Sequence, residues 1–387
     1  MVDSMGEGTI DNCAGPARAA AATVRHLYVH IPFCARICPY CAFYKERADP
    51  AQTARFCAAL LAELEWPTES YSLQPATIFF GGGTPTALTT AQLEILLGGL
   101  QERLDVSGLR EWTFEANPGS VSERKARLLH ESGVNRVSLG VQSFDDDLLR
   151  LLGREHSAEQ AEASFHLLRR SGCENLSVDL MFGLPGQTLS QWETTLQRAI
   201  ALEPDHLSAY CLTYEEDTDF FLRHARGEFR IDAEADADFF NVAHDLLGEA
   251  GLLQYEVSNY ARPGFESVHN RAYWSGSDYV GIGPSAVSTL GLRRWQNVSD
   301  YRVYADRLLR GESVSTGDEI LTPQMKRAES IALSLRTSWG IPAEWVRDRP
   351  NEVEEFVRLG LMLPKAERYV LTREGRFLAD SVAEAFI

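Results

Sequence analysis

Long hydrophobic runs are absent from this chain of 387 residues. No apolar stretch approaches the roughly 18 residues that a membrane-spanning helix requires, so the sequence predicts no membrane span. The first 25 residues carry acidic side chains among small ones, with neither the apolar segment of a signal peptide nor the arginines of a transit peptide. We therefore expect residues 1–25 to be a disordered leader and the protein to be soluble, with peripheral contact to a membrane surface left open.

Positive charge is also scarce. The chain has 37 Lys and Arg against 55 Asp and Glu, which gives a formal net charge of −18 at pH 7. Nucleic-acid binding depends on cationic side chains that replace the counterions of the phosphates. This charge balance argues against a nucleic-acid partner, and so against a tRNA-modifying function.

The cysteines are too few and too unevenly spaced for the disulfide framework of a secreted domain. Of seven cysteines, three are clustered and four are scattered. This distribution is typical of a protein in a reducing compartment that uses the cluster for metal or redox chemistry. It predicts a cytoplasmic protein. We assign no site role to the scattered cysteines, because a free cysteine packs as a small hydrophobe; they are Cys13, Cys57, Cys173 and Cys211.

Short β-rich runs alternate with longer helical patterns over the first 250 residues. This alternation indicates parallel strands joined by helices. Six strands are too few for a full eight-stranded barrel, so the sequence predicts an α/β protein with an incomplete (β/α)6, TIM-like barrel and its chemistry at the C-terminal strand ends. The strands are predicted at residues 27–31, 76–80, 111–116, 135–141, 175–183 and 206–212.

Helix-start signals support the same alternation. Polar N-cap residues stand before four of the predicted helices, and one of them has the reciprocal partner of a capping box three residues later. These signals are Asp49 before Pro50, Thr89 and Thr90, Ser122, and the pair Ser157 and Gln160.

The length and the change of pattern along the chain predict a large domain followed by a smaller one. We expect the partial barrel at residues 26–250 and a connecting and capping region, rich in Gly, Pro, Ser and aromatic residues, at 251–319. Residues 320–387 read as two helices, a short β-turn-β segment and a final helix. They predict a small α+β domain of winged-helix type, for which the acidic charge argues against DNA binding.

Three cysteines in the stretch HIPFCARICPYCAFY form a C-x3-C-x2-C pattern in the loop after the first predicted strand: Cys34, Cys38 and Cys41. A structural zinc site usually has four protein ligands, and no fourth Cys or His lies in the following loop. A four-iron cluster held by three thiolates keeps one iron open for an exchangeable ligand. The remaining alternative, three buried core cysteines, fits poorly with a loop that also contains Pro32 and Pro39.

This pattern resembles the signature of the radical SAM superfamily, and the longer form YVHIPFC…CPYCAF resembles its coproporphyrinogen dehydrogenase group. Further matching motifs include GGGTPT, EANPGS, NRVSLGVQSF and VDLMFGLPGQT, and the resemblance covers residues 27 to about 290. It implies a 4Fe-4S cluster whose open iron is chelated by the amino and carboxylate groups of S-adenosylmethionine.

The resemblance also implies a set of residues that bind S-adenosylmethionine. A glycine-rich segment would contact the methionine end, an arginine would suit its carboxylate, and an acidic residue would suit the ribose hydroxyls. Taken singly, each of these residues has a plainer explanation as a tight turn, a surface polar group or a packed aromatic ring. The set comprises Tyr28, Tyr40, Gly82, Gly83, Thr84, Glu115, Gln142, Arg154 and Asp179.

Two branches of the family remain to be distinguished. Oxygen-independent coproporphyrinogen oxidases typically place another cysteine at the position of Phe43, whereas CPYCAF with HNRAYW resembles the HemW-type haem chaperones. Their H-N-x-x-Y-W motif implies haem binding, with His269 as candidate axial ligand and Asn270, Tyr273 and Trp274 in support. Arginines suited to haem propionates stand nearby at Arg262, Arg271, Arg293 and Arg294.

Each branch predicts a different function. A carrier would bind haem as cargo and pass it to apo-haemoproteins such as respiratory-chain proteins, with the cluster and S-adenosylmethionine assisting. An enzyme would use the same cofactors to decarboxylate coproporphyrinogen III oxidatively. The sequence favours the carrier and leaves open whether the protein is also an enzyme. A purely structural HNRAYW segment, with His269 bonded to backbone, is the third alternative.

Overall fold

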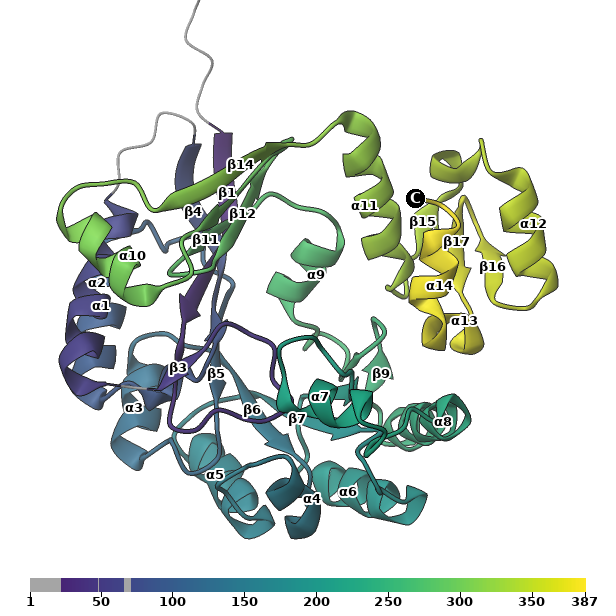
Figure 1. Cartoon of the computed structure of the whole chain (residues 1–387), viewed down its shortest axis with the longest axis horizontal. Coiled ribbons are helices and arrows are strands. Elements are labelled where there is room, and N and C mark those ends of the chain that lie inside the picture. The colour runs from purple at the N-terminus through teal and green to yellow at the C-terminus, as the bar shows by residue number, and fades with distance from the viewer. Residues whose placement is uncertain (1–21, 48, 66–70) are drawn as a thin grey trace, which may run out of the picture.

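A computed structural model describes residues 22–47, 49–65 and 71–387. A nine-stranded sheet forms its centre, in the order β11-β1-β4-β5-β6-β7-β8-β10-β9 (Figure 1). Six consecutive members of this sheet are parallel and agree with the six predicted strands, which confirms the incomplete barrel. They are β1 (Ala22–Ile31), β4 (Tyr71–Gly82), β5 (Glu111–Ala116), β6 (Arg136–Gln142), β7 (Asn175–Phe182) and β8 (His206–Cys211).

The first strand is longer than predicted. β1 begins at Ala22, because Ala22, Thr23 and Val24 pair with the start of β4. Residues 22–25 therefore belong to the sheet, and the rest of the predicted leader, with Cys13, lies outside the described residues.

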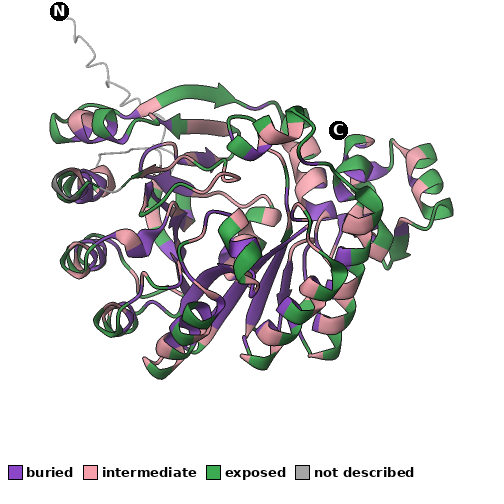
Figure 2. Cartoon of the chain, turned by 60° about the horizontal axis from the view of Figure 1, so that its bottom comes forward, coloured by how far each residue is buried: buried purple, intermediate pink, exposed green. Residues whose placement is uncertain are grey.

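Helices cover the outer face of the parallel strands, so the sheet is buried between them and the barrel interior (Figure 2). The predicted helix starts are confirmed, and Thr89 and Ser157 each form a capping box with a glutamine three residues later. The main covering helices are α1 (Pro50–Leu64), α2 (Thr90–Arg103), α3 (Glu123–Glu131), α5 (Ala158–Arg170), α6 (Leu189–Ala201) and α8 (Ala233–Glu249), with the short α4 (Asp146–Leu151) and α7 (Asp219–Ala225) between them.

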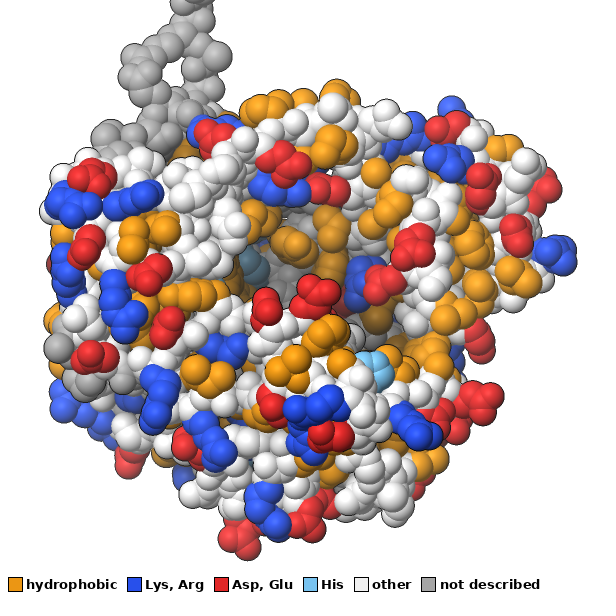
Figure 3. Space-filling model, viewed as in Figure 1, with side chains coloured by type: hydrophobic (Ala, Val, Ile, Leu, Met, Phe, Trp, Pro, Cys, Tyr) orange, Lys and Arg blue, Asp and Glu red, His pale blue; other side chains and the backbone are white. Residues whose placement is uncertain are grey.

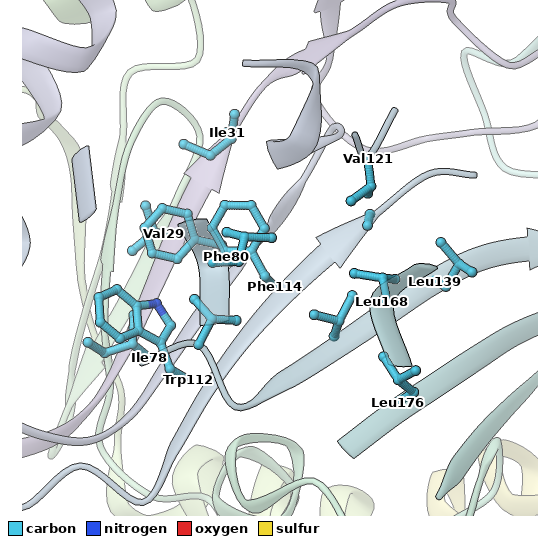
Figure 4. Packing of buried hydrophobic residues seen from close by; sticks show 14 of the residues in the cluster. Val29, Ile31, Ile78, Phe80, Trp112, Phe114, Val121, Leu139, Leu168 and Leu176 are labelled. Carbon is cyan, nitrogen blue, oxygen red and sulfur yellow. The ribbon is translucent and has the colours of Figure 1, made fainter. Parts of the chain in front are cut away.

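The hydrophobic core lies between these strands and helices (Figure 4). Large aromatic residues of adjacent strands pack face to face, as for Phe80 and Phe114, whose ring centroids are 4.7 Å apart. Val29, Ile78 and Trp112 are also almost completely buried in this cluster. The core residues alternate with inward-facing residues along each strand, so the barrel interior is left to the polar side chains described below.

Residues 251–319 contain more regular structure than the sequence indicated. Three of their strands extend the central sheet, with β11 parallel to β1 and β10 antiparallel to β8. Three others form a separate antiparallel sheet. The elements are β9 (Leu253–Gln254), β10 (Asn259–Ala261), α9 (Val268–Trp274), β11 (Val280–Ile282), β12 (Val287–Leu290), β13 (Arg293–Asn297), α10 (Tyr301–Leu309) and β14 (Ser315–Ile320).

The C-terminal part has its own hydrophobic cluster, which includes Ile331, Leu335 and Met362. The predicted order of two helices, a β-turn-β segment and a final helix is confirmed, with a short third strand and a divided last helix in addition. Within the described ranges, no helix combines the length and apolar character needed to cross a membrane. The elements are α11 (Pro323–Leu335), β15 (Ile341–Pro342), α12 (Pro350–Arg358), β16 (Met362–Lys365), β17 (Arg368–Leu371), α13 (Arg373–Phe377) and α14 (Ala379–Glu384).

Candidate cofactor site

The three clustered cysteines lie on the loop that follows β1 and crosses the open side of the sheet (Figure 1). Both ends of this loop are fixed, because the short strands β2 (Phe33–Cys34) and β3 (Glu46–Arg47) pair with each other. The middle is held by the backbone N–H of Phe220, which donates to the carbonyl of Pro39 over 3.1 Å, and by packing of Tyr40 against the Phe220 ring. The loop is therefore a fixed platform for its thiols.

The thiols of Cys34, Cys38 and Cys41 are half-buried and none forms a disulfide. Burial raises the pKa of the Cys34 and Cys41 thiols, and the neighbouring cysteines contribute to the rise for both. Thiolates so close together gain from a shared positive group, and the ligands of an iron–sulfur cluster are thiolates. The donor chemistry of this loop therefore fits a cluster with three protein ligands. Among the described residues, no three His, Cys, Asp or Glu side chains converge on a single metal-ion position.

The glycine-rich segment after β4 lies directly against the start of the cysteine loop. Gly83 N–H donates to the carbonyl of Ile31 and Thr84 N–H to that of Phe33, both over 2.8 Å. Gly82 has a φ of +103°, and a Cβ atom there would lie 2.4 Å from the His30 ring. This close approach explains why the segment needs glycine and shows how it comes to border the cysteine loop.

A chain of polar contacts connects the first two cysteines through three other loops. The Cys34 thiol lies 3.6 Å from the Thr84 hydroxyl, which accepts from the Asn117 amide over 2.8 Å. The Asn117 carbonyl accepts from Arg154 Nη2 over 2.7 Å, and Arg154 Nη1 lies 3.8 Å from the Cys38 sulfur. The guanidinium is thus oriented by Asn117 and faces the cysteine loop, where it would stabilise a thiolate.

A cavity of about 290 Å³ opens beside this chain of contacts. Its wall combines backbone of the cysteine loop with polar side chains from the loops that follow β4, β5 and α4. The residues that line it include Arg36, Cys38, Thr84, Asn117, Ser120, Arg154, His156 and Gln160.

Two partly buried carboxyl groups face the barrel interior. Asp179 accepts hydrogen bonds from the hydroxyls of Ser138, Ser177 and Ser208, at distances between 2.8 and 3.1 Å. Burial nevertheless raises its pKa, and burial together with the charge of Asp179 raises the pKa of Glu115 to about 8. A hydrogen-bond donor or a cation beside either carboxyl group would stabilise its ionised form and offset the cost of burying that charge.

The guanidinium of Arg136 counteracts both shifts. Its side chain is only 2% exposed, and its charge lowers the pKa of Asp179 and Glu115. No ion pair of Arg136 is formed with the described part of the chain, and its Nε atom is buried without a hydrogen-bond partner. The barrel interior therefore contains a buried cation whose charge acts on both carboxyl groups.

The remaining predicted residues border the same interior. Tyr28 on β1 lies with its hydroxyl 3.1 Å from His30 Nδ1, and its ring stacks on Phe79. Gln142 ends β6 with a φ of +69°, a conformation that non-glycine residues adopt rarely and that marks a constrained position. Tyr40 belongs to the cysteine loop itself, where its ring packs against Phe220 of α7 and its hydroxyl interacts with the Cys38 thiol.

The HNRAYW segment forms α9, which lies beside the barrel strands (Figure 1). Glu111 of β5 accepts from the backbone N–H groups of Val268 and His269, over 2.7 and 2.9 Å, and so fixes the start of the helix. The His269 ring is 9% exposed, with Nδ1 2.8 Å from the Thr77 hydroxyl. Burial lowers its pKa to about 3, so the imidazole is neutral.

The other residues of this segment face different surroundings. Tyr273 is 44% exposed, and the Arg336 guanidinium lies 5.3 Å from the ring of Trp274. Of the nearby arginines, Arg293 and Arg294 are already paired with carboxylates, at 2.9 Å and 2.6 Å. Their pairing leaves less of their charge for a bound propionate.

Several residues of the site escaped the sequence reasoning. Asn117 lies in the EANPGS motif and was given no role, although a polar residue before proline after a strand is a usable signal. Ser138, Ser177 and Ser208 occupy alternating inward positions of apolar strands, which the period of two would have placed on the interior face. Arg136, a charged residue at the start of a strand, offered no such signal.

The fold and this site define the class of protein. The sequence model of the family described as "Radical SAM superfamily" matches residues 28–199. Proteins named "Heme chaperone HemW" from Bacillus subtilis and Escherichia coli are 35% and 33% identical to the chain, over 94% and 93% of its length and 99% and 97% of theirs. The chain belongs to the HemW family within the radical SAM superfamily.

A solved structure supports the fold. The coproporphyrinogen III oxidase HemN of Escherichia coli superposes with a TM-score of 0.81, covering 96% of this chain and 91% of that one, at 24% sequence identity. At this identity the likeness concerns the fold.

Proposed function

We propose that this protein binds haem and transfers it to apo-haemoproteins, with a 4Fe-4S cluster and S-adenosylmethionine as resident cofactors. The observation that carries the proposal is the near-full-length similarity to proteins named heme chaperones. The HNRAYW helix beside the barrel supports it, because this segment provides a neutral imidazole and an exposed phenol on one helix. The free cysteines support a cytoplasmic location.

The cluster would be held by Cys34, Cys38 and Cys41. When bound, such a cluster with S-adenosylmethionine supplies an exchangeable iron ligand and one-electron chemistry. The protein's own contribution is to position these groups: the Arg154 guanidinium, aligned by Asn117, suits the methionine carboxylate. Its contact with the Cys38 sulfur would hold the guanidinium beside a cluster bound by these cysteines.

The rest of the cofactor would lie along the barrel interior. Asp179, with its three serine donors, suits the ribose hydroxyls, because a carboxylate accepts from two hydroxyls at once. The segment of Gly82, Gly83 and Thr84 would border the methionine amino group, and an ammonium beside Glu115 would lower the raised pKa of that carboxyl group. Tyr28, Tyr40 and Gln142 would then border the bound molecule or support its loops.

Haem would bind at the α9 segment with His269 as axial ligand through Nε2. The low pKa keeps the imidazole neutral, and with its proton on Nδ1, donated to the Thr77 hydroxyl, Nε2 would be the nitrogen with a free lone pair for iron. Asn270, Tyr273 and Trp274 would support this ligation from the same helix.

Haem titration of purified, anaerobically reconstituted protein tests the proposal. We expect about one haem per chain and an altered Soret spectrum or weaker affinity for His269→Ala, compared with His166→Ala on the outer helix α5 as control. An unchanged haem spectrum and affinity in His269→Ala would refute the axial assignment. A wild-type protein that binds no haem would refute the function.

Oxidative decarboxylation of coproporphyrinogen III is the competing function. The similarity of the fold to HemN is the observation in its favour. The same reconstituted protein, incubated with this substrate, S-adenosylmethionine and a strong one-electron reductant, should leave the propionate side chains unchanged. Formation of protoporphyrinogen would establish the enzyme instead.

A further inference from the structure

A second cavity lies away from the cysteine loop, between α9, the sheet β12-β13-β14 and α11. Its volume is about 460 Å³, within the roughly 300–1,000 Å³ of most small-molecule sites. Figure 3 shows the molecule in the view of Figure 1, with a hollow at the centre of this face. The residues that carry the argument are Tyr273, Tyr279, Arg294, Lys326, Glu329 and Ala332.

The lining of this cavity combines polar and charged residues with aromatic and aliphatic ones. Among the latter, Tyr273 and Tyr279 stand edge to face, with ring centroids 5.7 Å apart, and the others are Val287, Ala332 and Leu333. Tyr273 belongs to the HNRAYW helix and is 44% exposed, a large fraction for an aromatic side chain beside a cavity. Such a lining favours a flat apolar molecule that can lie against a phenol ring.

Cationic groups lie at the edge of the same cavity. Arg294 uses three of its five N–H donors, two on Glu329 at 2.6 and 2.8 Å and one on the Thr289 hydroxyl at 3.2 Å. The Lys326 ammonium forms no hydrogen bond or ion pair with the described residues, although its stem is half-buried. A carboxylate on the bound molecule would therefore find an unpaired cation at Lys326.

The cavity also adjoins the barrel. Tyr279 immediately precedes β11, whose residues Val280 and Gly281 pair with Leu27 and Tyr28 of β1. The phenol of Tyr279 is close enough to contribute to the raised pKa of Tyr28. A molecule in the cavity would thus lie next to the edge of the candidate cofactor site.

We propose that this cavity is the seat of the porphyrin, with the macrocycle against Tyr273 and Tyr279 and a propionate on Lys326. This inference rests on the proposed haem function and locates the cargo between α9 and α11. His269 stands one helical turn before Tyr273 on α9 but does not line the cavity, so the macrocycle would have to extend from the cavity past Tyr273 for its iron to meet His269. Shape and charge, and not iron ligation, would hold the part that lies in the cavity. The porphyrin should accordingly bind even without iron.

Titration with haem, followed by absorption, and with metal-free protoporphyrin IX, followed by fluorescence, tests the assignment. Ala332→Trp fills the cavity and should weaken both affinities at least tenfold, and Lys326→Glu should weaken both about three- to tenfold. His269→Ala should change the haem spectrum and leave the affinity for metal-free porphyrin within twofold of wild type. Gln324→Trp, on the exposed side of α11, and Lys365→Glu, on β16, are matched controls expected to bind like wild type.

The outcomes separate the two levels of the proposal. A wild-type protein that binds no haem refutes the haem function itself. If wild type binds haem and both Lys326→Glu and Ala332→Trp bind it with unchanged affinity, the cavity assignment is wrong. It is also wrong if wild type binds haem but no metal-free porphyrin. In both cases the haem function still stands. Thermal denaturation of each variant identifies a folding defect, and Lys326→Glu, a partly exposed position, decides the matter if Ala332→Trp does not fold.

Discussion

His206 Nδ1 lies 2.8 Å from the hydroxyl of Ser177, which in turn lies 3.1 Å from Asp179 Oδ1. An ionised carboxylate only accepts, so Ser177 donates its proton to Asp179 and must accept from His206. His206 Nε2 is then left to accept from the Tyr255 hydroxyl, 2.8 Å away, and Tyr255 accepts from the N–H of Ser267, which caps α9. Every donor in this chain points from the HNRAYW helix towards Asp179.

This direction fixes the tautomer of His206. Burial, aided by the charge of Arg136, lowers its pKa well below the ordinary value, so the ring is neutral. We predict a neutral imidazole with the proton on Nδ1 between pH 5.5 and 8, seen in the ¹⁵N chemical shifts of histidine-labelled protein. A proton on Nε2, or titration in this range, would contradict the hydrogen-bond assignment.

Asp179→Asn should weaken S-adenosylmethionine binding. The carboxylate is the acceptor for three hydroxyls and the candidate acceptor for the ribose, and hydrogen bonds to a charged group contribute about 1.5–3 kcal/mol each. We therefore expect about a 10- to 150-fold loss of affinity by isothermal titration calorimetry, with a smaller loss for Ser177→Ala. Asp238→Asn, an exposed aspartate of α8, should bind like wild type; equal affinity in Asp179→Asn would remove this residue from the site.

Gly82→Ala should destabilise the fold. Its φ of +103° is costly for alanine, and the new Cβ would collide with the His30 ring. A loss of about 1–3 kcal/mol in the free energy of unfolding is expected from chemical denaturation. Gly98→Ala is the matched control: it lies within α2 with no atom near its Cβ position, so it should gain about 0.5–1 kcal/mol. Equal stability of Gly82→Ala and wild type would mean that the segment is not held as described.

The pH dependence of stability provides a test away from the site. Glu63 of α1 accepts from Tyr304, Asn297 and the backbone of Gly283, and burial raises its pKa to about 7. In the unfolded chain the pKa of Glu63 is about 4.5. Between pH 4.5 and pH 7 the folded state therefore binds this proton more tightly than the unfolded chain does. The contribution of this proton to stability, at most about 3 kcal/mol, is present below pH 4.5 and is lost as pH rises through 7.

Glu63→Gln removes this titration. The free energy of unfolding of wild type relative to Glu63→Gln should therefore fall between pH 5 and pH 8, as measured by urea denaturation at each pH. A difference that stays constant or rises with pH would contradict the buried, protonated carboxyl.

The sequence was sufficient to predict the strands and helices that have a clear side-chain periodicity or a clear N-cap residue. The six parallel strands are short β-rich runs that alternate with helical patterns, and the helix after Ser157 begins as its capping box predicted. The strands β9, β10 and β11 were missed because each has only two or three residues, too few to show a period. Only the tertiary pairing with β8 and β1 makes them strands.

The site was predictable only as far as its residue types were distinctive. The spacing of the cysteines and the cluster of glycines pointed to the loops after β1 and β4, which the structure places side by side. Asn117, Arg136 and the serines around Asp179 are common residue types, and their role arises from register between neighbouring strands. The environment of His269 could not be foreseen either, since its Thr77 partner is 192 residues distant in sequence.

Electron paramagnetic resonance of the reduced, anaerobically reconstituted protein tests the central claim most directly, with and without S-adenosylmethionine. Because three thiolates leave one iron without a protein ligand, we predict about four irons per chain and a 4Fe-4S signal that changes when S-adenosylmethionine is added. The cluster should be lost in Cys38→Ala. It should be kept in Cys57→Ala, whose cysteine is buried in α1. A protein that takes up zinc and no iron, or a cluster whose signal is indifferent to S-adenosylmethionine, would contradict the account.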